Sequence, residues 1–266
     1  MRFGCCSNMV AKGKDGTGIE VLEKLVEFGY DYIELPLAQM MELSDEEFEE
    51  LKQRVERSGI NCEACNNFFP VYMRLTGPET DKAAIEKYYK KALKRSGELG
   101  ASIVVFGSGP AKNVPNGFPL EDGYIQVVKL LKEIAPVAKE NGITIAIEPL
   151  RKAECNLINT FKEGCRLSKD VDHPNVKVMV DYYHLMQENE PVQNLLDLGK
   201  ENLVHVHFAR NEGRVYPKTL EEDGYKPFID TLKAIGYTGR VSCEAYADDF
   251  ESQAKDAIAF FRNNFI

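Results

Sequence analysis

A repeated pattern of helices that end at glycine, each followed by a short apolar strand, most constrains how this chain folds. The junctions are Phe28-Gly29-Tyr30, Ser58-Gly59-Ile60, Leu99-Gly100-Ala101, Asn141-Gly142-Ile143 and Ile235-Gly236-Tyr237. Glycine accepts the left-handed backbone conformation that ends a helix before the chain reverses. Regular alternation of this kind predicts an α/β fold in which helices cover parallel strands.

Eight strands are expected, several of them nearly continuous apolar runs, as strands buried on both faces are. They span Arg2–Cys6, Tyr32–Leu35, Asn61–Asn66, Ser102–Gly107, Thr144–Glu148, Lys177–Asp181, Leu203–Phe208 and Arg240–Glu244. The expected helices span Gly18–Phe28, Ser44–Arg57, Thr80–Leu99, Glu121–Glu140, Thr160–Lys169, Val192–Leu198, Tyr225–Ile235 and Phe250–Phe261. Ser44, with Glu47 three residues later, predicts a capping box at the start of the second helix.

Eight such units in about 250 residues predict a (β/α)8 TIM barrel that forms a single domain over residues 1–266. A doubly wound open sheet is the alternative fold. No GxGxxG sequence follows the first strand, which disfavours the dinucleotide-binding form of that sheet.

Charge and composition exclude several functional classes. The chain has 33 basic and 42 acidic residues, a net charge of −9, and no basic stripe that would bind nucleic acid. No apolar run is long enough to span a membrane, and the N-terminus lacks the apolar segment of a secretory signal. Seven cysteines, an odd number, indicate buried thiols rather than a disulfide framework. We therefore expect a cytoplasmic protein.

The last four predicted strands each end in a carboxylate or an imidazole. These residues are Glu148, Asp181, His207 and Glu244, and their spacings of 33, 26 and 37 residues each match one strand–helix unit. A lone acid after a strand is usually a helix cap or a solvated loop residue. Four in succession should converge at the mouth of the barrel, where barrel enzymes place their chemistry. Three carboxylates and one imidazole suit Mn²⁺ best, with Mg²⁺ or Co²⁺ as alternatives.

The same segments resemble a known family. Ile147-Glu148-Pro149-Leu150 with Glu154-Cys155-Asn156, Val180-Asp181-Tyr182-Tyr183-His184, His205-Val206-His207 and Cys243-Glu244 are similar to the xylose isomerase-like barrels. Within them the pattern is nearest to the sugar phosphate isomerases/epimerases and the ketose 3-epimerases of the D-tagatose and D-psicose group. The resemblance follows the strand order along nearly the whole chain.

The resemblance implies roles for individual residues. It makes Glu148, Asp181, His207 and Glu244 the metal ligands, and it implies that Glu154 and His184 contact the substrate hydroxyls beside the carbonyl. An arginine after the metal histidine completes that group, and Arg214 fits this place better than Arg210. Members of the family are often dimers or tetramers, so a homodimer or homotetramer is expected.

Two further polar groups near the expected mouth are candidates for substrate contact. Asn67, after the third strand, can donate hydrogen bonds to a polyol. Lys112, in the glycine-rich segment after the fourth strand, either meets a substrate phosphate or belongs to a structural loop.

These residues are suited to inverting a stereocentre beside a ketone. Glu148 and Glu244 form a natural acid–base pair, and a divalent ion stabilises the enediolate between the two proton transfers. The sequence therefore predicts a metal-dependent epimerase acting on a ketose at carbon 3. An aldose–ketose or hydroxypyruvate-type isomerase and an inosose-type dehydratase are alternatives, because they share that intermediate. A barrel that binds a sugar or a metal without turnover is the non-enzymatic alternative.

Overall fold

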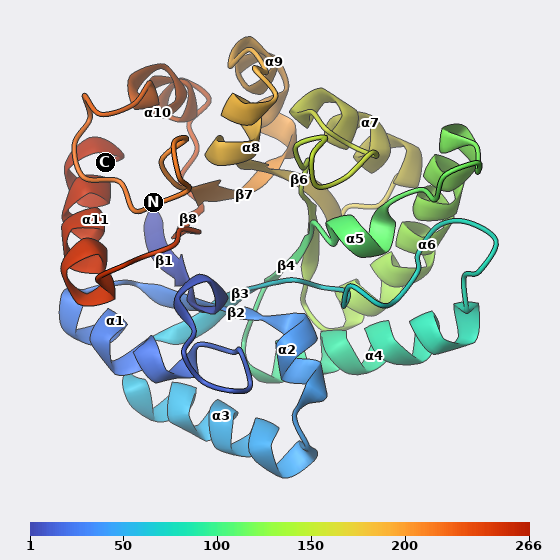
Figure 1. Cartoon of the computed structure of the whole chain (residues 1–266), viewed down its shortest axis with the longest axis horizontal. Helices are drawn as coiled ribbons and strands as arrows, with labels where there is room; N and C mark the ends of the chain where they lie inside the picture. The colour runs from blue at the N-terminus through green and yellow to red at the C-terminus, as the bar shows by residue number, and fades with distance from the viewer.

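The computed structural model describes residues 1–266, and its eight strands form one closed barrel (Figure 1). The strands are β1 (Arg2–Cys6), β2 (Tyr32–Pro36), β3 (Asn61–Asn66), β4 (Ile103–Phe106), β5 (Thr144–Ile147), β6 (Val176–Asp181), β7 (Leu203–Phe208) and β8 (Arg240–Cys243). Each pairs in parallel with the next, and β1 also pairs with β8, which closes the cylinder. The predicted (β/α)8 barrel is confirmed, and no strand end differs from its expected position by more than one residue.

The helices that cover the barrel lie where the sequence pattern places them. They are α1 (Leu22–Phe28), preceded by the short 3₁₀ helix η2 (Ile19–Val21), then α3 (Asp45–Ser58), α4 (Lys82–Glu98), α6 (Leu120–Glu140), α7 (Phe161–Val171), α9 (Gln193–Asn202), α10 (Tyr225–Ala234) and α11 (Phe250–Asn264). The capping box of Ser44 and Glu47 is present at the start of α3. No helix has both the length and the apolar character needed to cross a bilayer.

Four short helices were not predicted. They are η1 (Ser7–Val10), α2 (Leu37–Glu42), α5 (Gly109–Lys112) and α8 (Tyr182–Gln187), and each follows a strand of the barrel closely. Helices of four to six residues are too short to show a 3.6-residue apolar period, so the sequence pattern does not reveal them. Together they form much of the rim at the carboxyl ends of the strands, which faces the viewer in Figure 1.

The barrel interior is a packed core rather than a channel. An inner cluster contains Tyr32, Ala64, Ile103, Val105, Ala146 and Met179. Gly4 on β1 leaves room for the Tyr32 ring, because a Cβ at position 4 would overlap that ring. A larger apolar core lies between the strands and the surrounding helices. Layered packing of this kind gives a rigid floor beneath the rim.

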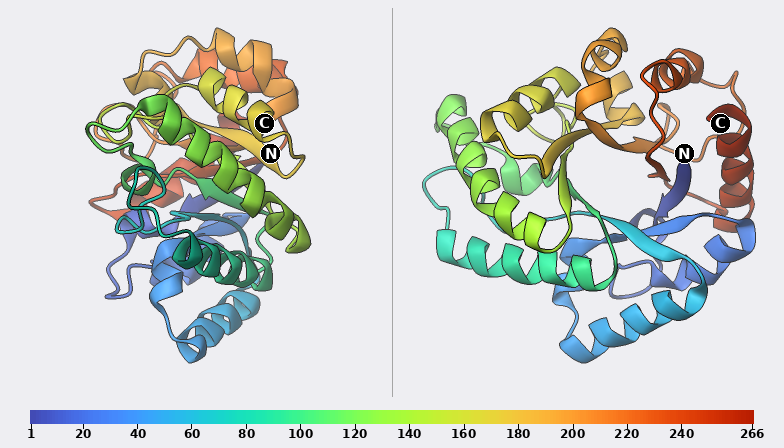
Figure 2. Two further views of the ribbon diagram at one scale, coloured as in Figure 1. Left: turned by 90° about the vertical axis from the view of Figure 1, so that its right-hand side faces the viewer. Right: turned by 180° about the vertical axis from the view of Figure 1, so that it is seen from behind.

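The last helix holds the two ends of the chain together. Phe261 of α11 stacks on Phe3 of β1 with ring centroids 5.5 Å apart, and Phe265 meets the edge of Phe3. Figure 2 shows the two termini close together and the ring of helices seen from the side and from behind. The first and last strands therefore keep a fixed register, which positions β8 and its terminal Glu244 relative to the other strands.

Candidate metal centre and active site

Four side chains from neighbouring strand ends meet at the mouth of the barrel. Glu148 follows β5, Asp181 ends β6, His207 lies on β7 and Glu244 follows β8. One ligand atom of each lies within 4.8 Å of the other three, and all four residues are buried. Ligands held at about 2.1 Å from a central ion lie up to about 4.2 Å apart, so this group needs only a small contraction around a divalent cation.

The Glu148 carboxylate passes over Gly107 to reach the other three residues of the group. Its backbone N–H donates to the Phe106 carbonyl oxygen at 3.2 Å, which continues the pairing of β5 with β4. The carboxylate packs over Gly107, where a Cβ would overlap Glu148 Oε2. Its Oε1 is buried, has no hydrogen-bond partner, and lies 3.4 Å from His207 Nδ1. An unpaired buried carboxylate oxygen aimed at the shared centre is what a metal ligand requires before the metal binds.

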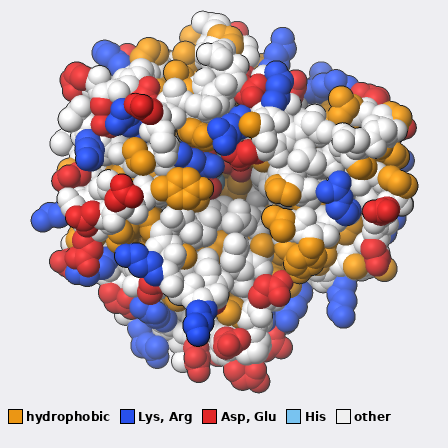
Figure 3. All heavy atoms as spheres, viewed as in Figure 1, with side chains coloured by type: hydrophobic (Ala, Val, Ile, Leu, Met, Phe, Trp, Pro, Cys, Tyr) orange, Lys and Arg blue, Asp and Glu red, His pale blue; other side chains and the backbone are white.

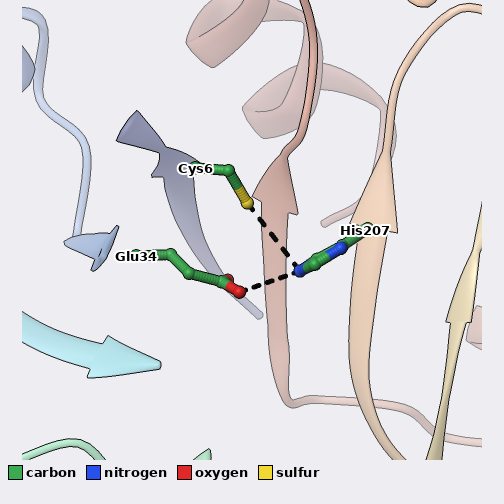
Figure 4. A group of neighbouring side chains, drawn as sticks. All are labelled: Cys6, Glu34 and His207. Carbon is green, nitrogen blue, oxygen red and sulfur yellow. Dashed lines mark hydrogen bonds and ion pairs between the residues drawn. The ribbon is translucent and has the colours of Figure 1, made fainter. Parts of the chain in front are cut away.

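Glu34, in the middle of β2, holds His207 from the opposite side (Figure 4). His207 Nε2 lies 2.9 Å from Glu34 Oε1 and 3.8 Å from Cys6 Sγ. Glu34 Oε2 lies 2.9 Å from His205 Nε2 and accepts a hydrogen bond from Ser242 Oγ at 2.5 Å. A carboxylate can only accept, so without a metal His207 donates from Nε2 to Glu34 and from Nδ1 to Glu244 Oε2, 3.0 Å away. A metal ion held by Nδ1 would take the place of that second proton, while Glu34 keeps the proton on Nε2.

Arg214 links two of the acidic residues. Its Nη2 donates to Asp181 Oδ2 at 3.1 Å and to Glu244 Oε2 at 2.5 Å, and the guanidinium lies over the Tyr183 ring. The other oxygen of Asp181 accepts from the Tyr183 backbone N–H at 2.8 Å and so caps α8. Asp181 is therefore both a helix cap and a member of the acidic group.

Burial and neighbouring charges set the protonation of the site without a metal. Burial raises the pKa of Asp181, with His184 and Arg214 opposing that rise. Burial also disfavours the Glu244 carboxylate, but Arg214 and His207 outweigh it and lower the pKa of Glu244. Burial disfavours a charged His207 as well, yet the acidic groups around it raise the pKa of His207 well above its usual value. The three carboxylates of the group therefore share only a few positively charged neighbours within the protein. Three carboxylates and one imidazole suit a hard or borderline divalent ion.

A cavity of about 430 Å³ opens directly above this group. Glu148 and Glu244, which are 6% and 8% exposed, line this cavity. Asp181 and His207, which are 2% and 0% exposed, lie beneath it. Glu154, His184, Arg214 and Asn67, the residues expected to contact substrate, also line the cavity. In Figure 3 the molecule is hollowed over the centre of the barrel, with acidic atoms at the edge of the hollow.

Glu154 and His184 are held in place by their own neighbours. Arg151 Nε donates to Glu154 Oε1 at 2.7 Å, and His184 Nδ1 accepts the Arg151 backbone N–H at 3.3 Å. His184 Nε2 lies 3.5 Å from Asp181 Oδ2 and 3.9 Å from Glu154 Oε2. This set joins the acidic centre to the wall formed by the segment after β5.

The structure also places three polar residues near the site, namely Arg210, His205 and Lys112. Arg210 pairs with Glu212 and does not line the cavity, so the cavity contains Arg214 alone of the two candidate arginines. His205 lies outside the four-residue group and contacts Glu34. The phosphate-contact alternative for Lys112 is wrong, because Lys112 is fully buried in α5 with its Nζ 3.4 Å from the Glu148 carbonyl oxygen.

The hydrogen bonds of Glu34 and the far wall of the cavity were not predicted from sequence. The sequence signal for the partners of Glu34 is the alternation of His205 and His207, which places both side chains on one face of β7. The far wall includes Asn8, Gln39, Glu42 and Tyr72, which come from η1, α2 and the segment after β3. Loop positions of this kind carry no periodic signal.

Gly107 provides a direct test of the site geometry. We expect Gly107→Ala to displace the Glu148 carboxylate, because the new Cβ takes its space, while the fold is retained because only a side-chain end must move. A displacement of about 1 Å lowers activity by about 10²-fold. Manganese titration and thermal unfolding should show weaker binding with little change in Tm. Gly224→Ala is the matched control, since its Cβ would meet nothing nearer than the Tyr182 hydroxyl at 3.7 Å. Equal effects of the two substitutions would contradict this geometry.

Comparison with known proteins agrees with the fold. Residues 22–264 match the family model described as the xylose isomerase-like TIM barrel. The chain is 26% identical over 232 residues to a D-psicose 3-epimerase of Ruminiclostridium cellulolyticum, covering 85% of this chain and 77% of that protein. It is 24% identical to a ketose 3-epimerase of Arthrobacter globiformis, covering 93% and 84%. A crystal structure of D-psicose 3-epimerase with D-tagatose from Clostridium cellulolyticum H10 superposes with a TM-score of 0.86 at 23% identity, covering 100% and 99%. The chain therefore belongs to the xylose isomerase-like TIM-barrel family.

Proposed function

We propose that this protein is a divalent-metal-dependent sugar epimerase that inverts carbon 3 of a ketose. The proposal is supported by similarity to ketose 3-epimerases over most of the chain and by the buried acidic group at the barrel mouth. Glu148, Asp181, His207 and Glu244 would hold the ion. Mn²⁺ fits this oxygen-rich set best, with Mg²⁺ and Co²⁺ as alternatives.

The observation that supports the proposal most strongly is that two of the four residues in the acidic group line the cavity and two do not. Of its four members, only Glu148 and Glu244 line the cavity, and they come from strands separated by β6 and β7. Two carboxylates that reach the ligand space from different strands can address two faces of one carbon atom. Epimerisation needs this arrangement, because the proton leaves one face and another returns to the opposite face.

The proposed reaction has two proton transfers. One glutamate removes the proton from carbon 3, which leaves an enediolate, and the other returns a proton to the opposite face of that carbon. A divalent cation, when bound, acts as a Lewis acid that makes the ketone easier to deprotonate. Glu154, His184 and Arg214 would orient the hydroxyl groups beside the carbonyl.

Deuterium incorporation tests the reaction type. The protein, reconstituted with Mn²⁺, is incubated in D₂O with a panel of free ketoses that includes D-psicose, and the recovered sugars are analysed by NMR. We expect deuterium at carbon 3 together with appearance of the C3 epimer. Protein treated with EDTA is the control and should show neither, with recovery when Mn²⁺ is added back.

The other outcomes identify the competing reactions. Deuterium at carbon 1 with formation of an aldose would indicate an aldose–ketose isomerase. Loss of water from the substrate would indicate a dehydratase. Saturable sugar binding without deuterium exchange would indicate a binding protein, and each of these results would reject the epimerase proposal.

A further inference from the structure

The cavity extends well beyond the residues needed to hold a keto group. Its inner part lies at β5, β6 and β8, where Glu148, Glu154, His184 and Glu244 face it. It then continues across the mouth to the elements that follow β1, β2 and β3. We call this far wall the outer subsite, and define it by Asn8, Gln39, Glu42, Asn67, Val71 and Tyr72.

The outer subsite contains polar groups that lack partners within the protein. Gln39 Oε1 is buried without a hydrogen bond. Asn8 uses its Oδ1 to accept a hydrogen bond from Asn66, which leaves its own NH₂ group to donate. Asn67 is held with a φ of 49°, and its carbonyl accepts the Ala38 N–H, so its backbone is fixed against α2. Amide groups that line a cavity and have donors or acceptors free can bond to a ligand there.

The charge of the lining indicates what kind of ligand fits. Arg214 is the single Lys or Arg that lines the cavity, and its guanidinium already bonds to Asp181 and Glu244. Four glutamates line the same cavity, including Glu42 of the outer subsite. A phosphate or carboxylate there would meet repulsion without a counter-charge. The outer subsite therefore suits an uncharged group.

An exposed aromatic ring lies at the rim of the outer subsite. The side chains of Tyr72 and Val71 are 67% and 68% exposed. The Tyr72 hydroxyl donates to Glu42 Oε1 at 2.9 Å, which orients the ring. Figure 3 shows hydrophobic side chains bordering the hollow. A fixed aromatic face beside free amides is suited to a sugar ring, which has an apolar face and hydroxyls around its edge.

We propose that the outer subsite binds a second, uncharged sugar ring, so that the substrate is a ketose carrying a glycosidic substituent at carbon 4, 5 or 6. This inference rests on the proposed function, because it places the keto end of the ligand at Glu148 and Glu244. The far end of the ketose then points toward Gln39 and Tyr72, and the second ring fills the remaining cavity. The free amides bond to hydroxyls of that ring.

Ketose disaccharides provide the test. Wild-type protein with Mn²⁺ is assayed with D-fructose, with lactulose (galactose on O4 of fructose) and with isomaltulose (glucose on O6). We expect kcat/KM to be at least tenfold higher for one of the disaccharides than for D-fructose. Gln39→Leu and Tyr72→Ala should each lower the ratio of disaccharide to D-fructose kcat/KM by about tenfold, the value of one hydrogen bond or one ring contact. Gln53→Leu, an exposed glutamine on α3, should leave that ratio at its wild-type value.

Binding separates failure of this inference from failure of the proposed function. Calorimetry on the Mn²⁺-loaded protein should show tighter binding of a disaccharide than of D-fructose, and Gln39→Leu should remove the difference. If D-fructose binds as well as both disaccharides, or if Gln39→Leu weakens all three sugars equally, the outer subsite is rejected while the epimerase proposal stands. Preferential disaccharide binding without turnover of any ketose would reject the epimerase proposal and support the subsite.

Discussion

Replacing either Glu148 or Glu244 by glutamine should lower kcat by about 10²–10⁴-fold, the range that a positioned acid or base contributes. Both carboxylates line the cavity, and an amide of the same shape cannot take up or return a proton. The measurement is steady-state turnover of a ketose at saturating Mn²⁺, so that weakened metal binding does not account for the loss. Glu212→Gln is the control, because this exposed glutamate lies after β7 and pairs with Arg210.

Deuterium exchange sharpens this test. If one glutamate removes the proton and the other returns it, a variant that lacks only the returning group should still exchange carbon 3 with solvent without forming the epimer. We therefore expect one substitution to abolish exchange and epimerisation together and the other to abolish epimerisation more strongly than exchange. Near-wild-type turnover in both variants would exclude the two-glutamate mechanism.

Replacing Glu34 by glutamine should weaken metal binding by about 10–100-fold, as is typical when the hydrogen-bond partner of a metal-binding histidine is lost. Glu34 does not line the cavity, so the effect must pass through His207. Glutamine presents an N–H donor at one of the two positions where Glu34 accepts, and there it opposes an imidazole N–H. If His207 loses its Nε2 proton in response, the proton that remains is on Nδ1, the nitrogen turned toward the acidic group.

Two measurements distinguish this positioning role from a general loss of stability. Mn²⁺ affinity is measured by calorimetry, and the protonation of each ring nitrogen of His207 is read from its imidazole ¹⁵N shifts in the metal-free protein, where the wild type should carry both protons. Glu63→Gln is the matched control, since Glu63 is a buried strand glutamate that pairs with Arg2 and Arg240 at the other end of the barrel. It should lower Tm while leaving Mn²⁺ affinity at the wild-type value. A Glu34→Gln variant that loses stability but keeps both its Mn²⁺ affinity and the protonation of both His207 ring nitrogens would contradict the assignment.

The barrel could be predicted from sequence because its signals are local. An apolar run such as Val178-Met179-Val180 identifies a buried strand, and a glycine such as Gly142 marks the preceding helix end. The short rim helices lack such signals. Helix α8, for example, is capped by Asp181, which the sequence places in the acidic group, and nothing in the sequence shows that one oxygen of this carboxylate also caps a helix.

The candidate site could be predicted only where it lies on the strands. Glu148, His207 and Glu244 follow the strand period, so their convergence is a consequence of the barrel itself. Whether Lys112 faces the cavity depends on how the segment after β4 folds, which the sequence does not show. In the structure this segment forms α5, and Lys112 is buried in the core. The outer subsite is assembled from segments far apart in the chain, such as those of Asn8 and Tyr72, and no local pattern joins them.

The row of hydrogen bonds beneath the group of Glu148, Asp181, His207 and Glu244 limits how this protein can diverge. Tyr32 bonds to Ser242, Ser242 to Glu34, and Glu34 to His205, all inside the barrel where no water can replace a lost partner. A mutation at one of these positions leaves the polar groups of its neighbours without hydrogen-bond partners. These residues must therefore be substituted together during neutral drift. Descendants of this sequence that keep His207 should therefore inherit Glu34, His205 and Ser242 together, even where their substrates differ.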